Sequence, residues 1–148
     1  MSEKLSFEEM FEQQGYLVYT TKGTSMYPML RQNRDLVIIS AKPEGLLNKY
    51  DVILFKRNGK YILHRVVGVK ENDYTTAGDN TISKEYHVKD KEILGVLTSF
   101  VRDGKEIKTT DKDYKMYVRI LYGLDPVRRN LRRTKAKVRS KIKSWIKR

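Results

Sequence analysis

The sequence predicts a mainly β domain with a short helix at its N-terminus and a basic helix at its C-terminus. Short runs of β-branched and aromatic residues separated by turn residues fill its centre, and apolar residues recur at helical spacing near its end. The 148 residues, 39% of them hydrophobic, suffice for one compact domain and leave little room for a second core. We therefore expect a helix in 1–15, a β-domain in 16–110 and a helical tail in 111–148.

The N-terminal helix is predicted over residues 7–14. Ser6 and Glu9 have the spacing of a capping box, in which each side chain bonds the backbone N–H of the other residue. Leu5 and Met10 are spaced for a hydrophobic staple. Gly15 then provides a left-handed residue that ends the helix.

Strands are predicted where β-branched and aromatic residues cluster. These segments are 17–21, 36–40, 52–57, 61–69, 74–76 and 93–102. Asn58-Gly59 and Asp103-Gly104 stand between pairs of such runs and predict tight hairpins, because both central residues of the turn need positive φ. The stretch ISKEYHVKD around His87 is polar and rich in turn residues, and no strand is predicted there.

The positive charge is concentrated in the tail. The net charge is +13; residues 1–114 hold 18 basic and 17 acidic residues, whereas 115–148 hold 13 basic residues and only Asp125. Asp125 is the expected N-cap of a helix, with Pro126 at its first position. One face of this helix is apolar and the opposite face is almost wholly Lys and Arg. The apolar residues are Leu124, Val127, Leu131, Val138, Ile142 and Trp145.

Composition excludes several kinds of site. The chain has no cysteine and two histidines, so we expect no disulfide, thiolate nucleophile or metal centre, and no cofactor. The longest apolar runs, such as 93–97, are about a quarter of the roughly 20 residues that span a bilayer. The first 15 residues carry four glutamates and lack the apolar stretch of a secretory signal. We therefore expect a cytoplasmic location with neither a transmembrane helix nor a signal peptide.

The segment GTSMYPML places Ser25 in a loop between Gly23 and Pro28. A serine in such a loop is usually a turn residue, and it becomes a nucleophile only where a neighbouring base accepts its proton. His64, in the predicted strand YILHRVVGV, is better held than His87, although a half-buried structural histidine is the alternative. Asp79, in TAGDN, is placed to orient the imidazole or to serve only as a turn residue.

The ordered series GTSMYPML, NRDLVII, YDVILFK, HRVVGV and TAGDN resembles the signal peptidase I superfamily of serine proteases over about residues 17–100. The bacterial branch and the LexA-type self-cleaving repressors pair the serine with a lysine. His64 stands at that position here, so the chain is similar to the Ser-His branch of endoplasmic-reticulum, archaeal and sporulation-type signal peptidases. The resemblance implies coiled antiparallel β-sheets that form a partly open barrel.

The resemblance also implies roles for single residues. Ser25 would be the acylated nucleophile, His64 the general acid and base, and Asp79 a member or supporter of the catalytic group. Met26 and Pro28 would shape the loop beside the scissile bond.

The chain departs from the family pattern at two points. Glu85 is a weak match to a second acidic residue that follows GDN in eukaryotic members. Gly23 replaces a hydroxyl residue that helps to form the oxyanion hole in many bacterial members, which leaves the backbone N–H of Ser25, with Thr24 nearby. Arg65 follows the base and is expected at the surface or beside a carboxylate such as Asp35 or Asp51.

These observations predict a serine endopeptidase that removes a signal or leader peptide from a precursor, with small residues flanking the scissile bond. The alternative is a non-catalytic peptide-binding module on the same fold. Nucleic-acid binding by the tail is disfavoured because residues 1–114 are nearly neutral.

The tail itself is predicted to lie peripherally on the anionic inner face of the membrane. Leu131, Val138, Ile142 and Trp145 would contact the lipid. Docking of the apolar stripe on the β-domain is the alternative. The oligomeric state stays open.

Overall fold

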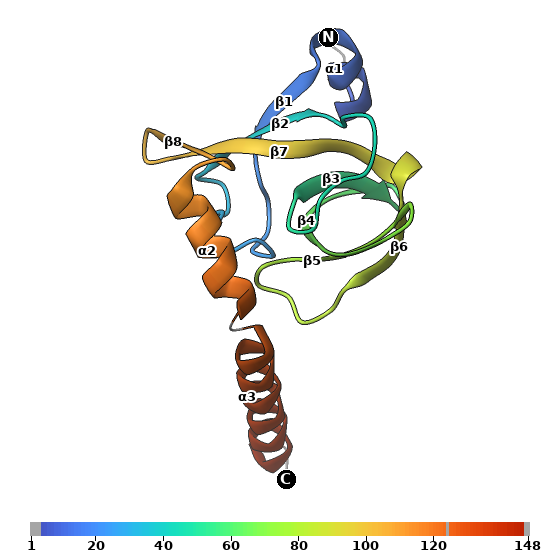
Figure 1. Cartoon of the computed structure of the whole chain (residues 1–148). Helices are drawn as coiled ribbons and strands as arrows, with labels where there is room; N and C mark the ends of the chain where they lie inside the picture. Colours follow the sequence, from blue (N-terminus) through green and yellow to red (C-terminus); the bar gives the residue numbers. More distant parts are fainter. Residues whose placement is uncertain (1–3, 124, 147–148) are drawn as a thin grey trace.

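Eight strands form one antiparallel sheet in the computed structural model, which describes residues 4–123 and 125–146 (Figure 1). The strands are β1 (Tyr16–Thr20), β2 (Leu36–Ala41), β3 (Val52–Arg57), β4 (Lys60–Lys70), β5 (Asp73–Ala77), β6 (Glu85–Lys89), β7 (Ile93–Arg102) and β8 (Lys105–Lys108). Their order is β1-β2-β7-β3-β4-β5-β6, with β8 on β7. Among the described strands β1 and β6 do not pair with each other, so the sheet is open and the predicted barrel-like closure is not seen.

The local signals that predicted the strands are confirmed. All six predicted strands are present, and β2, β3 and β7 begin where the sequence placed them. Both hairpins form: in the antiparallel register Arg57 of β3 lies opposite Lys60 of β4, and Arg102 of β7 lies opposite Lys105 of β8. The asparagine and aspartate at the tips have φ of 53° and 50°, and their glycines are also at positive φ, as these turns require.

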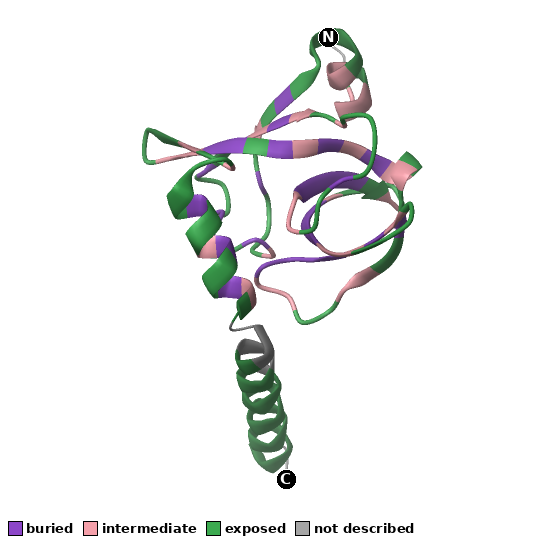
Figure 2. Cartoon of the chain, viewed as in Figure 1, coloured by how far each residue is buried: buried purple, intermediate pink, exposed green. Residues whose placement is uncertain are grey.

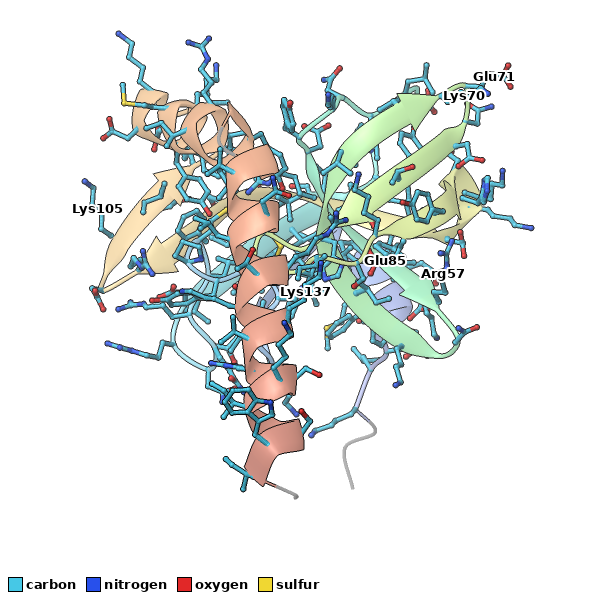
Figure 3. All side chains as sticks on the ribbon, turned by 90° about the horizontal axis from the view of Figure 1, so that it is seen from below. Arg57, Lys70, Glu71, Glu85, Lys105 and Lys137 are labelled. Carbon is cyan, nitrogen blue, oxygen red and sulfur yellow. The ribbon has the colours of Figure 1, made fainter. Side chains whose placement is uncertain are left out.

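Strand β6 corrects the expectation that the segment around His87 lacks a strand. Its residues pair with β5, for example Tyr74 with Val88 and Thr76 with Glu85. The Arg57 guanidinium donates 3.0 Å hydrogen bonds to the carbonyls of Tyr86 and His87. Figure 3 shows Arg57 and Glu85 among the side chains of this part of the sheet. Because tertiary partners hold this polar strand, its own composition did not predict it.

The helices are α1 (Phe7–Gln14), α2 (Lys112–Gly123) and α3 (Asp125–Ile146), with a 3₁₀ turn, η1 (Asp90–Glu92), before β7. The capping box of α1 is formed: Glu9 Oε2 accepts from the Ser6 N–H at 2.6 Å, and Ser6 Oγ accepts from the Glu9 N–H at 3.2 Å. Gly15 ends α1 at φ 77°. The helix boundaries predicted for 7–14 are confirmed.

The predicted tail consists of two helices with different surroundings. Helix α2 buries Tyr114, Val118 and Leu121 against the body and so belongs to its core (Figure 2). Helix α3 extends away from the sheet and is exposed along the side chains that the structure describes. Leu124, predicted on its apolar face, lies outside the described residues. Within 4–123 and 125–146, none of the helices has the combination of length and apolar character needed to cross a bilayer.

Candidate functional site

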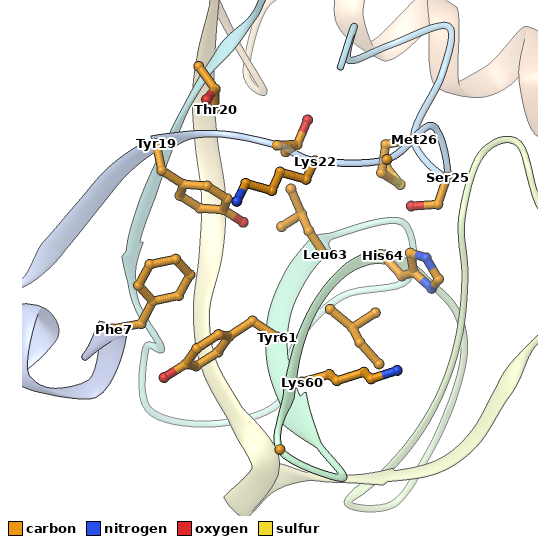
Figure 4. Close-up of a pocket in the computed structure, with 14 residues that line it drawn as sticks. Phe7, Tyr19, Thr20, Lys22, Ser25, Met26, Lys60, Tyr61, Leu63 and His64 are labelled. Atoms are coloured by element: carbon orange, nitrogen blue, oxygen red, sulfur yellow. The ribbon is translucent and has the colours of Figure 1, made fainter. Parts of the chain in front are cut away.

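A cleft of about 790 Å³ lies between β1 and the first half of β4. The end of β1, the loop after it and residues 59–64 form its walls. Ser25 and His64 both line this cleft, and Figure 4 shows their side chains next to each other at one end. The structure therefore brings together the two residues that the sequence predicted as nucleophile and base.

The loop that carries Ser25 and the imidazole of His64 approach each other closely at Gly78. A Cβ atom added at Gly78 would lie 2.5 Å from the Ser25 carbonyl oxygen and 3.1 Å from His64 Nε2. Both atoms therefore border the same small space, and Nε2 faces the Ser25 loop. A glycine is needed here because no side chain fits between the serine loop and the imidazole.

The loop that carries Ser25 is tied to the segment after β5. The backbone N–H of Asn80 donates to the Ser25 carbonyl at 2.8 Å, and its side-chain amide donates to the Thr24 carbonyl at 3.1 Å. Met26 is buried in the main core, whereas Pro28 is exposed. These contacts fix the loop from both sides and leave the Ser25 side chain partly exposed in the cleft.

Gly23 adopts φ 85°, a left-handed conformation that disfavours other residues. The glycine at this position is thus suited to the turn. Gly23 also lines the cleft with Ser25.

The imidazole of His64 is held by Glu85. His64 is 7% exposed, and its Nδ1 lies 2.7 Å from Glu85 Oε2. The same carboxylate oxygen accepts a 2.8 Å hydrogen bond from the Thr76 hydroxyl. Burial alone would raise the pKa of Glu85, but the hydrogen bonds from His64 and Thr76 outweigh burial and lower it below its usual range. An ionised Glu85 accepts from Nδ1–H, which leaves Nε2 as the basic nitrogen facing Ser25.

This geometry corrects the predicted partner of the imidazole. Glu85, the weaker sequence match, occupies the position expected for Asp79. The Asp79 carboxylate instead forms a bidentate pair with Arg65, with Nε to Oδ1 at 2.9 Å and Nη2 to Oδ2 at 2.8 Å. Both side chains of this pair are fully buried.

Tyrosines of α2 complete the surroundings of this ion pair. The hydroxyls of Tyr117 and Tyr122 donate to Asp79 at 3.1 and 3.0 Å. Arg65 donates to the Tyr50 carbonyl at 3.1 Å and to the Tyr114 hydroxyl at 2.9 Å. The pair therefore connects β4, the segment after β5 and α2 directly behind the site.

The surroundings of the other predicted carboxylates also differ from expectation. Arg65 lies in the core rather than at the surface, and Asp79 is its partner. Asp35 pairs with Arg31 at 2.7 Å, and Asp51 accepts from the Asn48 N–H. An arginine within an otherwise apolar strand signals a buried carboxylate partner, but the two candidates that the sequence suggested, Asp35 and Asp51, do not include the actual partner, Asp79.

If the site cleaves peptides, as the sequence predicts, replacing Glu85 by Gln should lower kcat/KM roughly 100-fold, because the imidazole loses the partner that fixes its tautomer and stabilises its charged form. Glu106→Gln, an exposed change of equal charge on β8, is the control. Steady-state kinetics on both variants measure the effect. A kcat/KM for Glu85→Gln within threefold of that for Glu106→Gln would contradict the role of Glu85 as the functional partner of the imidazole.

The same substitution has a pH signature in stability. Because folding lowers the pKa of Glu85, its ionised form stabilises the fold above the ordinary glutamate pKa, and this contribution is lost as pH falls through the lowered pKa. The difference in unfolding free energy between wild type and Glu85→Gln should therefore shrink in acid. Urea unfolding at several pH values measures it, and a difference that grows in acid would be the contrary result.

Comparison with models of known protein families finds no match to this chain, and no curated protein matches its sequence.

Proposed function

We propose that this chain is a serine endopeptidase of the signal peptidase I type, which cleaves a signal or leader peptide from a precursor. The observation that carries the proposal is the convergence of Ser25 and His64 on one cleft, with Glu85 on the far side of the imidazole. The open antiparallel sheet agrees with the sequence motifs that resemble this superfamily. The finer assignment to that fold is part of the proposal.

The arrangement supports an acyl-enzyme mechanism. His64 Nε2 accepts the Ser25 hydroxyl proton as Oγ attacks the scissile carbonyl, and the negatively charged Glu85 stabilises the imidazolium. Backbone N–H groups of the Ser25 loop stabilise the oxyanion. The imidazolium then protonates the leaving amine. Water, deprotonated by His64, hydrolyses the ester and regenerates the serine.

Unpaired strand edges favour an extended peptide as the ligand. Within the described sheet, β1 pairs only with β2, and β4 pairs with β5 only from Arg65 onward. The free edge of β1 and the free edge at residues 60–64 both border the cleft. A peptide lying between them can add backbone hydrogen bonds on either side, as in β-strand addition. Small residues beside the scissile bond remain an implication of the family resemblance.

An aromatic cluster closes the end of the cleft away from Ser25. The Phe7 ring lies 5.1 Å from that of Tyr19 and 4.4 Å from that of Tyr61, between ring centroids. Tyr61 lies three residues before His64 on β4, which is a distance of about 10 Å along the strand. We expect this cluster to contact a large apolar side chain about three residues from the scissile bond.

Replacing Phe7 by Ala is accordingly expected to raise KM three- to tenfold, that is by about 0.5–1.5 kcal/mol of contact energy, with kcat little changed. The effect should appear with a peptide that carries a large apolar residue at that distance and disappear with one that carries alanine there. Val18→Ala on the exposed face of β1 is the control. Equal KM changes for both peptides would argue against the contact.

The proposal is tested by incubating the protein with a peptide library containing Ala-X-Ala sites, followed by acid quenching and mass spectrometry. We expect defined cleavage products and an acyl adduct on the peptide that contains Ser25. Ser25→Ala should give neither. Peptide binding without cleavage, unchanged by Ser25→Ala and His64→Ala, would instead identify a non-catalytic binding module.

A further inference from the structure

The apolar stripe of α3 is uncovered in the structure. Its members expose between 51% and 77% of their surface, although a stripe of this kind normally packs against a core. They are Val127, Leu131, Val138, Ile142 and Trp145. Helix α2, by contrast, buries its apolar face on the body. The sequence-based alternative in which the α3 stripe docks on the β-domain is therefore not what the structure shows.

The face of α3 that approaches the body is a polar one. A groove forms between this face and the segment that follows Gly78. It is lined by Asn80, Ile82 and Ser83 on one side, and on the other by α3 residues that include Lys135, Arg139 and Lys143. At about 100° per residue, the stripe lies about a third of a turn around the helix from this face. The stripe is thus directed away from the groove.

Charge decides which partner fits the stripe. Nine of the 22 residues of α3 are Lys or Arg, and Asp125 is its only acidic residue. Figure 3 shows one of these lysines, Lys137, labelled on α3. A helix with an apolar stripe, a terminal tryptophan and basic flanks matches the lipid-water boundary of an anionic bilayer, where the stripe enters the acyl region and the cations contact headgroups.

We propose that α3 binds in the plane of an anionic lipid surface through this stripe. The helix that would hold the lipid also borders the candidate site, because Asn80 lines the groove beside α3 and its N–H donates to the Ser25 carbonyl at 2.8 Å. A substrate held at the same surface gains effective concentration over a free one. This last step, which assigns membrane-held precursors as the substrate class, depends on the proposed peptidase function; lipid binding does not.

Trp145 provides a direct probe because it is the only tryptophan of the chain. The full chain is titrated with phosphatidylcholine vesicles, with or without phosphatidylglycerol, while tryptophan emission and co-sedimentation are followed. With phosphatidylglycerol present, we expect emission to shift to shorter wavelength and the protein to sediment with the vesicles. Added salt should weaken binding. Equal binding to neutral vesicles, or no shift with anionic ones, overturns the proposal.

Two double variants of equal charge separate stripe insertion from general attraction. Leu131→Asp with Ile142→Asp places the charges in the stripe, and Asn130→Asp with Ser144→Asp places them on the polar side. All four positions are exposed, so neither change disturbs the core. We expect the partition coefficient of the stripe variant to fall at least about tenfold below that of the other. Equal losses of vesicle binding in the two variants would overturn the proposal. So would wild-type protein that binds the vesicles without a shift in tryptophan emission and is displaced by duplex DNA, because that result indicates general polyanion binding.

The substrate step has a separate test. A cleavable peptide is presented either free or attached by an acyl chain to anionic vesicles. We expect the wild type to cleave the attached peptide at least about tenfold faster, and the stripe variant to lose this preference while cleaving the free peptide normally. Ser25→Ala should bind vesicles as the wild type does. A failed cleavage assay with intact vesicle binding would therefore refute the peptidase proposal and leave lipid binding in place.

Discussion

Ser25→Ala, His64→Ala and the double variant are each expected to lower kcat for peptide cleavage by a similar factor of about 10⁴ or more. The two side chains act as one unit, because the hydroxyl attacks only when Nε2 takes its proton. Once either partner is lost, loss of the second has little further effect. The close approach of His64 Nε2 and the Ser25 loop at Gly78 is the structural basis of this expectation.

Single-turnover kinetics on the three variants measure this coupling. Ser83→Ala and His87→Ala are matched controls, because both residues are exposed and neither lines the cleft. If the factor by which kcat falls in the double variant were the product of the factors in the two single variants, Ser25 and His64 would contribute independently. They would then not act as a catalytic dyad. Unchanged peptide affinity in all three variants would assign the losses to chemistry rather than to binding.

Asp79→Asn is expected to destabilise the fold by about 3–5 kcal/mol, because it leaves the fully buried Arg65 guanidinium without a counter-charge. Arg65→Met should cost a similar amount, since it strands the Asp79 carboxylate in the core. The double variant removes both charges and keeps a side-chain oxygen that can accept from Tyr117 and Tyr122. It should therefore be more stable than the sum of the single losses predicts, by about 2 kcal/mol.

Urea unfolding of the four proteins gives this coupling energy. Additive losses, within about 0.5 kcal/mol, would mean that the ion pair makes no specific contribution. In protein that remains folded, cleavage should suffer less from Asp79→Asn than from Glu85→Gln, because Glu85 and not Asp79 contacts the imidazole. The reverse ranking would restore Asp79 to its predicted role beside the imidazole.

Local signals in the sequence determined the parts of the fold that depend on near neighbours. The α1 boundaries follow from Ser6, Glu9 and Gly15, because caps act within one helical turn. The hairpin turns follow from Asn-Gly and Asp-Gly, since few other pairs accept two positive φ values. Five ordered motifs also singled out Ser25 and His64, which the structure places on one cleft.

Tertiary structure decided which charged groups meet. Asp79 lies two residues after β5 and Glu85 begins β6, and composition gave no reason to assign one to Arg65 and the other to His64. That choice depends on register: successive residues of a strand point to opposite faces, so His64 and the adjacent Arg65 face different partners. The sequence also left undetermined whether the α3 stripe is exposed. An amphipathic pattern defines an apolar face, but only the packing of the whole chain shows whether the protein itself covers that face.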